Sequence, residues 1–207
     1  MLFRSDFPYN ITARCINKEW FNLPIELVWE IFCDELSRTI KEKGLQVHSF
    51  VLMANHFHLI ATTPEANISQ CMHQFMFRTS KLLTRNGNRI NETFAGRHKK
   101  CILDNNFYFM NAYKYNYRNP IKAGICSRVE DYKFSTLRGL INESEKRIPI
   151  CKDLFFLDNP KGVLKWLNLA PTPEKVEAFR MGLKHQYFKS AKKRDGVTAV
   201  ISEIELL

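Results

Sequence analysis

The chain has 207 residues, of which 45% are hydrophobic and 13% aromatic, so it can fill the core of one domain, with or without an appendage. Its formal net charge of +10 indicates a polyanionic partner. No apolar stretch reaches the length of a membrane span, the N-terminus lacks the pattern of a signal peptide, and no basic amphipathic helix suggests a membrane anchor. Nucleic acid is therefore the favoured partner.

Six cysteines are scattered along the chain, and none forms a Cys-x-x-Cys pair. This spacing argues against a zinc ribbon or a thioredoxin-like site. Since no export signal is present, we expect free thiols in a reducing cytoplasm.

The N-terminal third predicts a strand, a helix and a hairpin. Tyr9 to Cys15 alternates and is partly β-branched, which indicates a strand. Pro24 to Lys43 places apolar residues at helical spacing, with its proline in the first turn and Gly44 as a stop. Gln46 to Thr63 then predicts two strands joined by a tight turn at Ala54-Asn55.

Two histidines, His56 and His58, lie on the second strand of this hairpin. Residues i and i+2 of a strand point to the same face, so both imidazoles leave one face while Phe57 packs on the other. At a separation of about 6.6 Å they can bind one divalent metal together with a third ligand. The alternative is two half-buried histidines that are satisfied by hydrogen bonds.

The following segments complete an α+β pattern. A helix is expected from Asn67 to about Arg85, a short strand from Lys100 to Leu103, and a third helix from about Asn106 to Pro120. The order β-α-β-β-α-β of the first six elements matches the ferredoxin-like (RRM-like) split βαβ fold. Its four-stranded antiparallel sheet with helices on one face would leave the histidine face pointing at a groove or at the extra helix.

The chain changes character near Pro149, so we assign residues 1–148 to one domain and 149–207 to a partly helical C-terminal extension. Residues 158–162 predict a turn, and Pro171-Thr172-Pro173 precedes an amphipathic helix from Glu174 to about Tyr187. The extension also carries the basic run Lys192-Lys193-Arg194. It either docks over the groove or contacts the DNA stem, or it is a packing extension that covers one edge of the sheet.

The third helix combines polar and aromatic residues, with tyrosines at positions 113, 115 and 117. Tyr115 and Asn119, at i and i+4, share a helix face, so a phenol and an amide oxygen can meet a two-histidine site as nucleophile and third ligand. Pro120 disfavours helix at Asn119, where the helix should end or kink. The alternative is that one tyrosine is buried in the core and the others lie on the surface.

A tyrosine with a pKa near 10 needs an activated electrophile, such as a metal-polarised phosphodiester. This requirement fits DNA strand transfer through a phosphotyrosine.

These residues resemble the HUH-class single-tyrosine transposases of the IS200-like superfamily, and most closely the branch of REP-associated tyrosine transposases. The similarity covers about residues 8–140. Four segments carry it: Tyr9–Arg14, Val51–Leu59, Phe94–Lys99 and Tyr115–Gly124, trailed by Asp131–Thr136. Ala54, His98 and Phe134 stand where the family usually has proline, tyrosine and tryptophan, and none of these changes removes a catalytic group.

The resemblance implies a catalytic domain in residues 1–148 that nicks single-stranded DNA near a hairpin. Tyr115 would be the nucleophile, holding the 5′-phosphate and leaving a free 3′-hydroxyl, and His56, His58 and Asn119 would be the ligands for Mg²⁺ or Mn²⁺. A bacterial, cytoplasmic, nucleoid-associated protein is expected, as a monomer rather than a dimer. The alternatives are a catalytically idle DNA-hairpin-binding protein derived from a transposase and a phosphodiesterase without a covalent step.

Seven basic residues that flank the proposed site in sequence are the candidates for phosphate contacts. They are Arg78, Lys81, Arg97, Lys99, Lys100, Arg118 and Lys122. All candidate catalytic groups lie between His56 and Asn119, so the extension should tune the chemistry rather than perform it.

Overall fold

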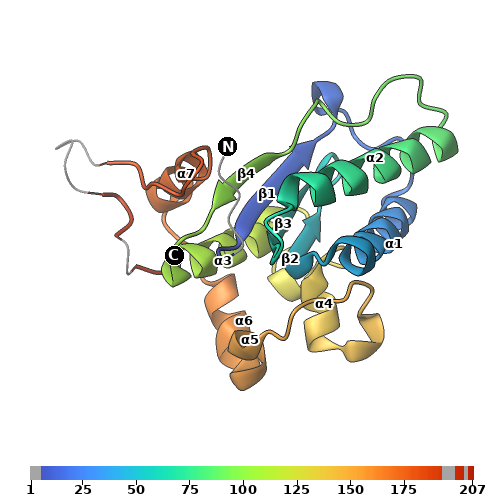
Figure 1. Cartoon of the computed structure of the whole chain (residues 1–207). Coiled ribbons are helices and arrows are strands. Elements are labelled where there is room, and N and C mark those ends of the chain that lie inside the picture. The colour runs from blue at the N-terminus through green and yellow to red at the C-terminus, as the bar shows by residue number, and fades with distance from the viewer. Residues whose placement is uncertain (1–5, 193–198, 203–204) are drawn as a thin grey trace.

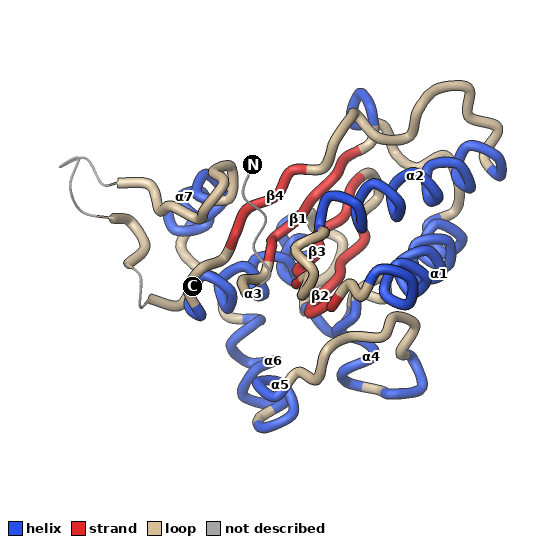
Figure 2. The backbone as a smooth tube through the Cα atoms, in the orientation of Figure 1, coloured by secondary structure: helices blue, strands red, loops and turns tan. Residues whose placement is uncertain are grey.

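The computed structural model describes residues 6–192, 199–202 and 205–207. Its centre is an antiparallel sheet in the order β2-β3-β1-β4 (Figure 2). The strands are β1 (Tyr9–Arg14), β2 (Gln46–Leu52), β3 (His56–Thr62) and β4 (Lys99–Ile102). With one helix between β1 and β2 and another between β3 and β4, this order is the predicted ferredoxin-like arrangement, and the predicted α+β class is confirmed.

The helices α1 (Ile25–Lys43) and α2 (Ile68–Asn86) cover one face of the sheet (Figure 1). α1 follows Pro24 and ends at Gly44, whose φ of 65° is the left-handed conformation that favours glycine. The alternate strand residues that face α1 and α2 are apolar and form the first core with the inner faces of both helices. This face therefore holds the sheet together and leaves the opposite face for other elements.

The helix α3 (Asn106–Lys122) packs on the opposite face, and residue Asn105 caps it by accepting a hydrogen bond from the Phe107 amide. Of the two alternatives at Asn119, an end or a kink, the end is wrong, because α3 continues past Pro120 to Lys122. A proline has no N–H to donate to the carbonyl one turn back. The side-chain amide of Asn119 donates instead to the carbonyls of Tyr115 and Asn116, at 2.9 and 3.5 Å.

The remaining chain forms short helices around α3. They are η2 (Val129–Asp131), α4 (Thr136–Ile141), η3 (Glu143–Glu145), α5 (Leu154–Asp158), α6 (Pro160–Asn168) and α7 (Pro173–Gly182), and η1 (Ile16–Lys18) follows β1. The predicted turn at residues 158–162 is wrong. Asn159 accepts a hydrogen bond from the Gly162 amide at 3.0 Å and so caps α6, whose first residue is Pro160.

The C-terminal extension packs on the α3 side of the sheet and along the β4 edge. α7 begins as predicted but ends at Gly182 instead of near Tyr187, because the next residues turn to pair with β4. The Ile102 amide donates to the Gln186 carbonyl at 2.8 Å, and the Phe188 amide donates to the Ile102 carbonyl at 3.0 Å. The extension therefore covers the β4 edge, one of the two roles considered for it, and α7 lies beside β4 in Figure 1.

A second core joins the sheet, α3 and the extension. Its buried members include Val51 and Ile60 from the sheet, Tyr117 from α3, and Leu167 and Phe179 from the extension. This core therefore contains residues from both sides of position 149. Lys193 and Arg194 of the basic run lie outside the described residues.

Two expectations about composition can also be compared with the structure. All six cysteines are free, and four of them are buried. Among the residues described, none of the helices has the length and hydropathy needed to span a bilayer.

Candidate active site

The two histidines of β3 point to the face that α3 covers. Their ring centroids lie 5.0 Å apart. Between them, Phe57 points to the other face and packs against Phe32 of α1 at a centroid distance of 5.8 Å. The strand alternation therefore brings His56 and His58 together as predicted.

The hydrogen bonds of the pair leave ring nitrogens available as ligands. His56 Nδ1 lies 2.7 Å from Asn55 Oδ1, and because an amide oxygen can only accept, Nδ1 carries the proton and Nε2 keeps its lone pair. His58 is buried, and neither of its ring nitrogens has a hydrogen-bond partner within the described part of the chain. The alternative of histidines satisfied by hydrogen bonds describes His56, whereas His58 has no such bond to a described residue.

Burial keeps both imidazoles neutral. It lowers the pKa of His56 to about 4, and the positive charge of Arg14 adds to this effect. The pKa of His58 is well below its usual value, first because of burial and then because of His56 and Arg14. A neutral imidazole with a free lone pair is the form that binds a metal, and an unpartnered buried nitrogen is what such a ligand leaves in the apo protein.

A third protein ligand would have to be something other than an acid, cysteine or histidine. Over residues 6–192, 199–202 and 205–207, no group of three or more such side chains could hold a metal ion. An amide or hydroxyl oxygen, a phosphate oxygen and water remain, and these are the ligands that Mg²⁺ and Mn²⁺ accept beside imidazole.

Among Tyr113, Tyr115 and Tyr117 of α3, Tyr115 is the one that meets the histidines. Its ring centroid lies 6.1 Å from that of His58, in an edge-to-face arrangement. Tyr113 and Tyr117 are buried and their hydroxyls bind Asp153 at 2.7 Å and Thr136 at 2.8 Å. The alternative with one core tyrosine is therefore wrong in its number: Tyr113 and Tyr117 both belong to the core, and Tyr115 is half-buried.

The phenol of Tyr115 is protonated at neutral pH. Burial, followed by the charge of Glu177, raises its pKa, while Arg180 and Arg14 oppose the shift. Phe179 of α7 covers the ring, with centroids 5.6 Å apart. A tyrosine in this state attacks only an electrophile that is itself activated.

A buried amide pair attaches α3 to the sheet beside Tyr115. Asn116, which is fully buried, donates from Nδ2 to Oδ1 of Asn10 on β1 at 2.9 Å. One residue further, the Tyr117 hydroxyl meets Thr136 Oγ1, which also accepts from the Phe50 amide of β2 at 2.8 Å. These contacts fix the position of α3 on the sheet and hence the position of Tyr115.

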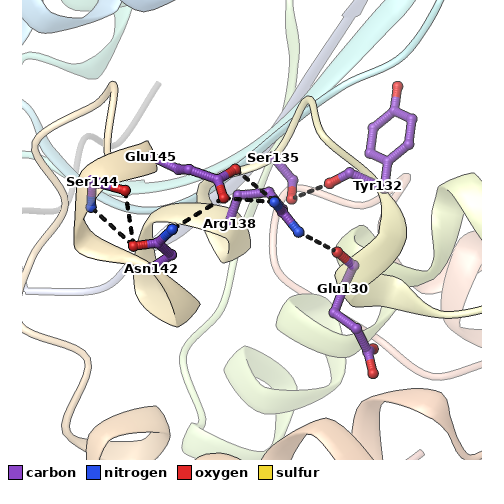
Figure 3. Close-up of polar contacts among 7 residues, drawn as sticks. All are labelled: Glu130, Tyr132, Ser135, Arg138, Asn142, Ser144 and Glu145. Atoms are coloured by element: carbon purple, nitrogen blue, oxygen red, sulfur yellow. Dashed lines mark hydrogen bonds and ion pairs between the residues drawn. The ribbon is translucent and has the colours of Figure 1, made fainter.

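The segment after α3 is held in place by a polar cluster (Figure 3). Arg138 binds both carboxylate oxygens of Glu145 at 2.6 and 2.8 Å and donates to the Glu130 carbonyl at 3.2 Å. Ser135 within this segment bridges to Val51, the residue before the end of β2. The cluster therefore supports the loop that presents Thr136 to Tyr117.

Asn119 lies one helical turn after Tyr115 and contacts it. Its amide nitrogen donates to the Tyr115 carbonyl, so its oxygen is left as an acceptor. Both residues line a pocket of about 420 Å³, and His56 and His58 are not among the described residues around it. The structure thus brings Tyr115 to the histidine pair and Asn119 to Tyr115.

The seven predicted DNA-binding residues fall on two sides of the molecule. Arg78 pairs with Glu42 of α1 at 2.8 Å, and Lys100 donates to Ser69 of α2 at 3.1 Å, so both lie on the face opposite the histidines. Lys81 is exposed on the same α2 helix.

Of the other four, Lys99 lies on the histidine face and two line the pocket beside Tyr115. Arg97 and Lys99 are exposed at the start of β4, where alternation directs Lys99 to the histidine face. Arg118 donates to the Leu167 carbonyl at 2.8 Å, and both Arg118 and the exposed Lys122 line the 420 Å³ pocket.

Arg14 is the residue at this site that the sequence did not single out. It pairs across the sheet with His56, so its exposed side chain shares the histidine face, and its charge lowers the pKa values of His56, His58 and Tyr115. Strand alternation alone could have put it on one face with Asn10 and Thr12. Its place opposite His56 needed the register between β1 and β3.

Comparisons with known proteins agree with this fold. Residues 25–99 match the family model described as "Transposase IS200 like", and the resemblance inferred from the sequence motifs is confirmed. A solved structure of a REP-associated tyrosine transposase bound to a REP hairpin superimposes with a TM-score of 0.60 at 17% identity, covering 74% of this chain and 90% of that chain. No curated protein matches the chain. At this identity the structural similarity establishes the α+β fold.

Proposed function

We propose that this protein nicks single-stranded DNA and transfers the cut strand through a covalent 5′-phosphotyrosine on Tyr115. The observation that carries the proposal is the Tyr115 ring 6.1 Å from His58, a buried histidine whose ring nitrogens have no partner within the described residues. The solved structure of similar fold was bound to a hairpin, which supports a substrate that contains one.

The chain's own groups suggest how the reaction proceeds. His56 and His58 would bind Mg²⁺ or Mn²⁺, with Asn119 as the candidate third ligand. When bound, such an ion polarises a phosphodiester oxygen and makes the phosphorus more electrophilic. Arg14, on the same face as His56, adds a fixed positive charge beside the phosphate.

The covalent step exchanges one phosphate ester for another. The Tyr115 oxygen forms a bond to phosphorus and its phenolic proton passes to water, while the bond from phosphorus to the 3′ oxygen breaks. That oxygen takes a proton and leaves as a free 3′-hydroxyl, and the 5′-phosphate stays on Tyr115. Attack by another 3′-hydroxyl reverses the step, so strands are rejoined without ATP.

Denaturing electrophoresis of the protein with end-labelled single-stranded DNA bearing a hairpin tests the proposal, with Mg²⁺ or Mn²⁺ present. We expect a protein–DNA adduct that withstands denaturation and that is absent with Tyr115→Phe or with excess chelator. Retarded DNA in native gels alone would instead identify an idle hairpin-binding protein. Cut DNA without an adduct would identify a phosphodiesterase.

A further inference from the structure

A pocket outside the histidine pair opens beside the proposed nucleophile. It has a volume of about 420 Å³ and lies between the Tyr115 face of α3 and the start of α7. Tyr115 and Asn119 of α3 line one side, and Pro173 and Val176 of α7 line the other. Because the Tyr115 ring also contacts His58, the pocket adjoins the histidine pair through Tyr115.

The walls of the pocket combine apolar surface with positive charge. Its volume lies in the range of roughly 300–1,000 Å³ that small ligands occupy. Lys122 is exposed at its rim and Arg118 lies one helical turn earlier. The carboxylate of Glu177, an acidic side chain of the lining, is paired with Arg180 at 2.5 Å, which offsets part of its negative charge.

A flat apolar group attached to a phosphate fits this combination. A nucleobase could lie against Tyr115 and Val176 while its phosphate meets Lys122, in the way that single-stranded DNA uses aromatic surfaces together with cationic grooves. A double-stranded stem could not enter, because paired bases do not present their faces.

We propose that this pocket binds one unpaired base of the DNA strand, next to the phosphate that Tyr115 attacks. The inference rests on the proposed function and adds a specific subsite to it. By holding the neighbouring nucleotide between α3 and α7, the pocket fixes the phosphate against the Tyr115 oxygen.

The test is a scan of hairpin-bearing oligonucleotides, each with one abasic site at a different position near the cleaved bond, with the rate of adduct formation as readout. We expect one adjacent position at which loss of the base lowers the rate roughly tenfold, the effect of losing one stacked base. An even response across all positions would overturn the proposal.

Val176→Trp, which fills the pocket, should lower the rate on the intact oligonucleotide by a similar factor. It should have no further effect on the oligonucleotide abasic at the sensitive position, because both changes remove the same contact. The matched control is Met181→Trp, on an exposed side of α7 outside the pocket, which should behave as the unsubstituted protein. Additive effects would contradict the inference, as would a folded Val176→Trp protein with an unchanged rate.

A binding measurement separates this inference from the proposed function. In Tyr115→Phe, 2-aminopurine at the position next to the expected cleavage site should change its fluorescence on binding, and Val176→Trp or the exposed substitution Lys122→Ala should weaken that response. If the unsubstituted protein forms no adduct but the fluorescence responds, the base-binding pocket stands and the proposed function fails. If the unsubstituted protein forms the adduct but 2-aminopurine responds at no position, the proposed function stands and the base-binding pocket is refuted.

Discussion

His58 combines burial with two ring nitrogens that have no partner in the described chain, which is unfavourable for the apo protein. We therefore expect His58→Leu, which keeps the volume and removes the polar atoms, to leave the free energy of unfolding unchanged or raise it by about 1 kcal/mol in chelator. The same variant should lose adduct formation. Urea denaturation measures the free energy of unfolding. If His58→Leu lowers it by more than about 1 kcal/mol, His58 is a structural histidine.

The buried histidines also predict a pH dependence of stability. Burial lowers the pKa values of His56 and His98 to about 4 and that of His58 well below 6.5. As pH falls below about 6.5, the unfolded chain takes up protons that the folded chain does not, so the free energy of unfolding should fall.

Denaturation with urea at pH 7 and pH 5, at constant ionic strength and in chelator, checks this expectation. His58 alone can contribute up to about 1.4 kcal/mol per pH unit, so His58→Leu should show the weaker dependence. Equal stability at both pH values would contradict the buried, neutral state of the pair.

At the scale of elements, the contact between α3 and β1 is expected to position the nucleophile. Asn116→Ala leaves the buried Asn10 oxygen without its donor and should cost about 1–3 kcal/mol of unfolding free energy. It should also slow adduct formation, because α3 loses the hydrogen bond beside Tyr115.

Asn10→Ala and the double variant complete the test. If the two side chains act through one hydrogen bond, the double variant should lose less than the sum of the single losses. Additive losses in urea denaturation would show that the pair does not couple α3 to the sheet.

Local signals predicted the elements that depend on local interactions. Apolar periodicity and the Gly44 stop located α1, and strand alternation put His56 and His58 on one face. The sequence could not decide whether the helix ends or kinks at Asn119, and it continues because the Asn119 side chain compensates for the missing N–H. The start of α6 was mistaken for a turn, because Asn-Pro-Lys-Gly is as typical of a capped helix start as of a turn.

The parts of the candidate site that depend on long-range pairing could not be derived from local patterns. Arg14 reaches the site through the strand register, and Phe179 covers Tyr115 from a helix 64 positions later in the chain. Helical spacing correctly grouped Tyr115 with Asn119. It could not show that Arg78 and Lys100 would lie on the face away from the histidines.

For the whole molecule, the charge of +10 predicts a DNA affinity that falls steeply with salt. The logarithm of affinity should decline with the logarithm of salt concentration by about 0.7 for each phosphate contact to a single strand. Lys99→Ala, on the histidine face, should reduce this slope by about 0.7. Lys81→Ala removes an equally exposed lysine from α2 on the other face and should leave the slope unchanged. Fluorescence anisotropy at several salt concentrations measures the slope for each variant. A DNA affinity that does not change with salt would mean that the positive charge does not serve to bind DNA.

The most direct measurement is the identity of the residue that carries DNA after the reaction. The adduct would be digested with nuclease and trypsin, and the modified peptide sequenced by mass spectrometry. Cleavage after Lys114 and Arg118 releases peptide 115–118, so Tyr113 is in a different peptide and fragment ions separate Tyr115 from Tyr117. We predict a 5′-linked nucleotide on Tyr115. A nucleotide on Tyr113 or Tyr117, or cleaved DNA with no modified tyrosine, would contradict the assignment of Tyr115 as the nucleophile.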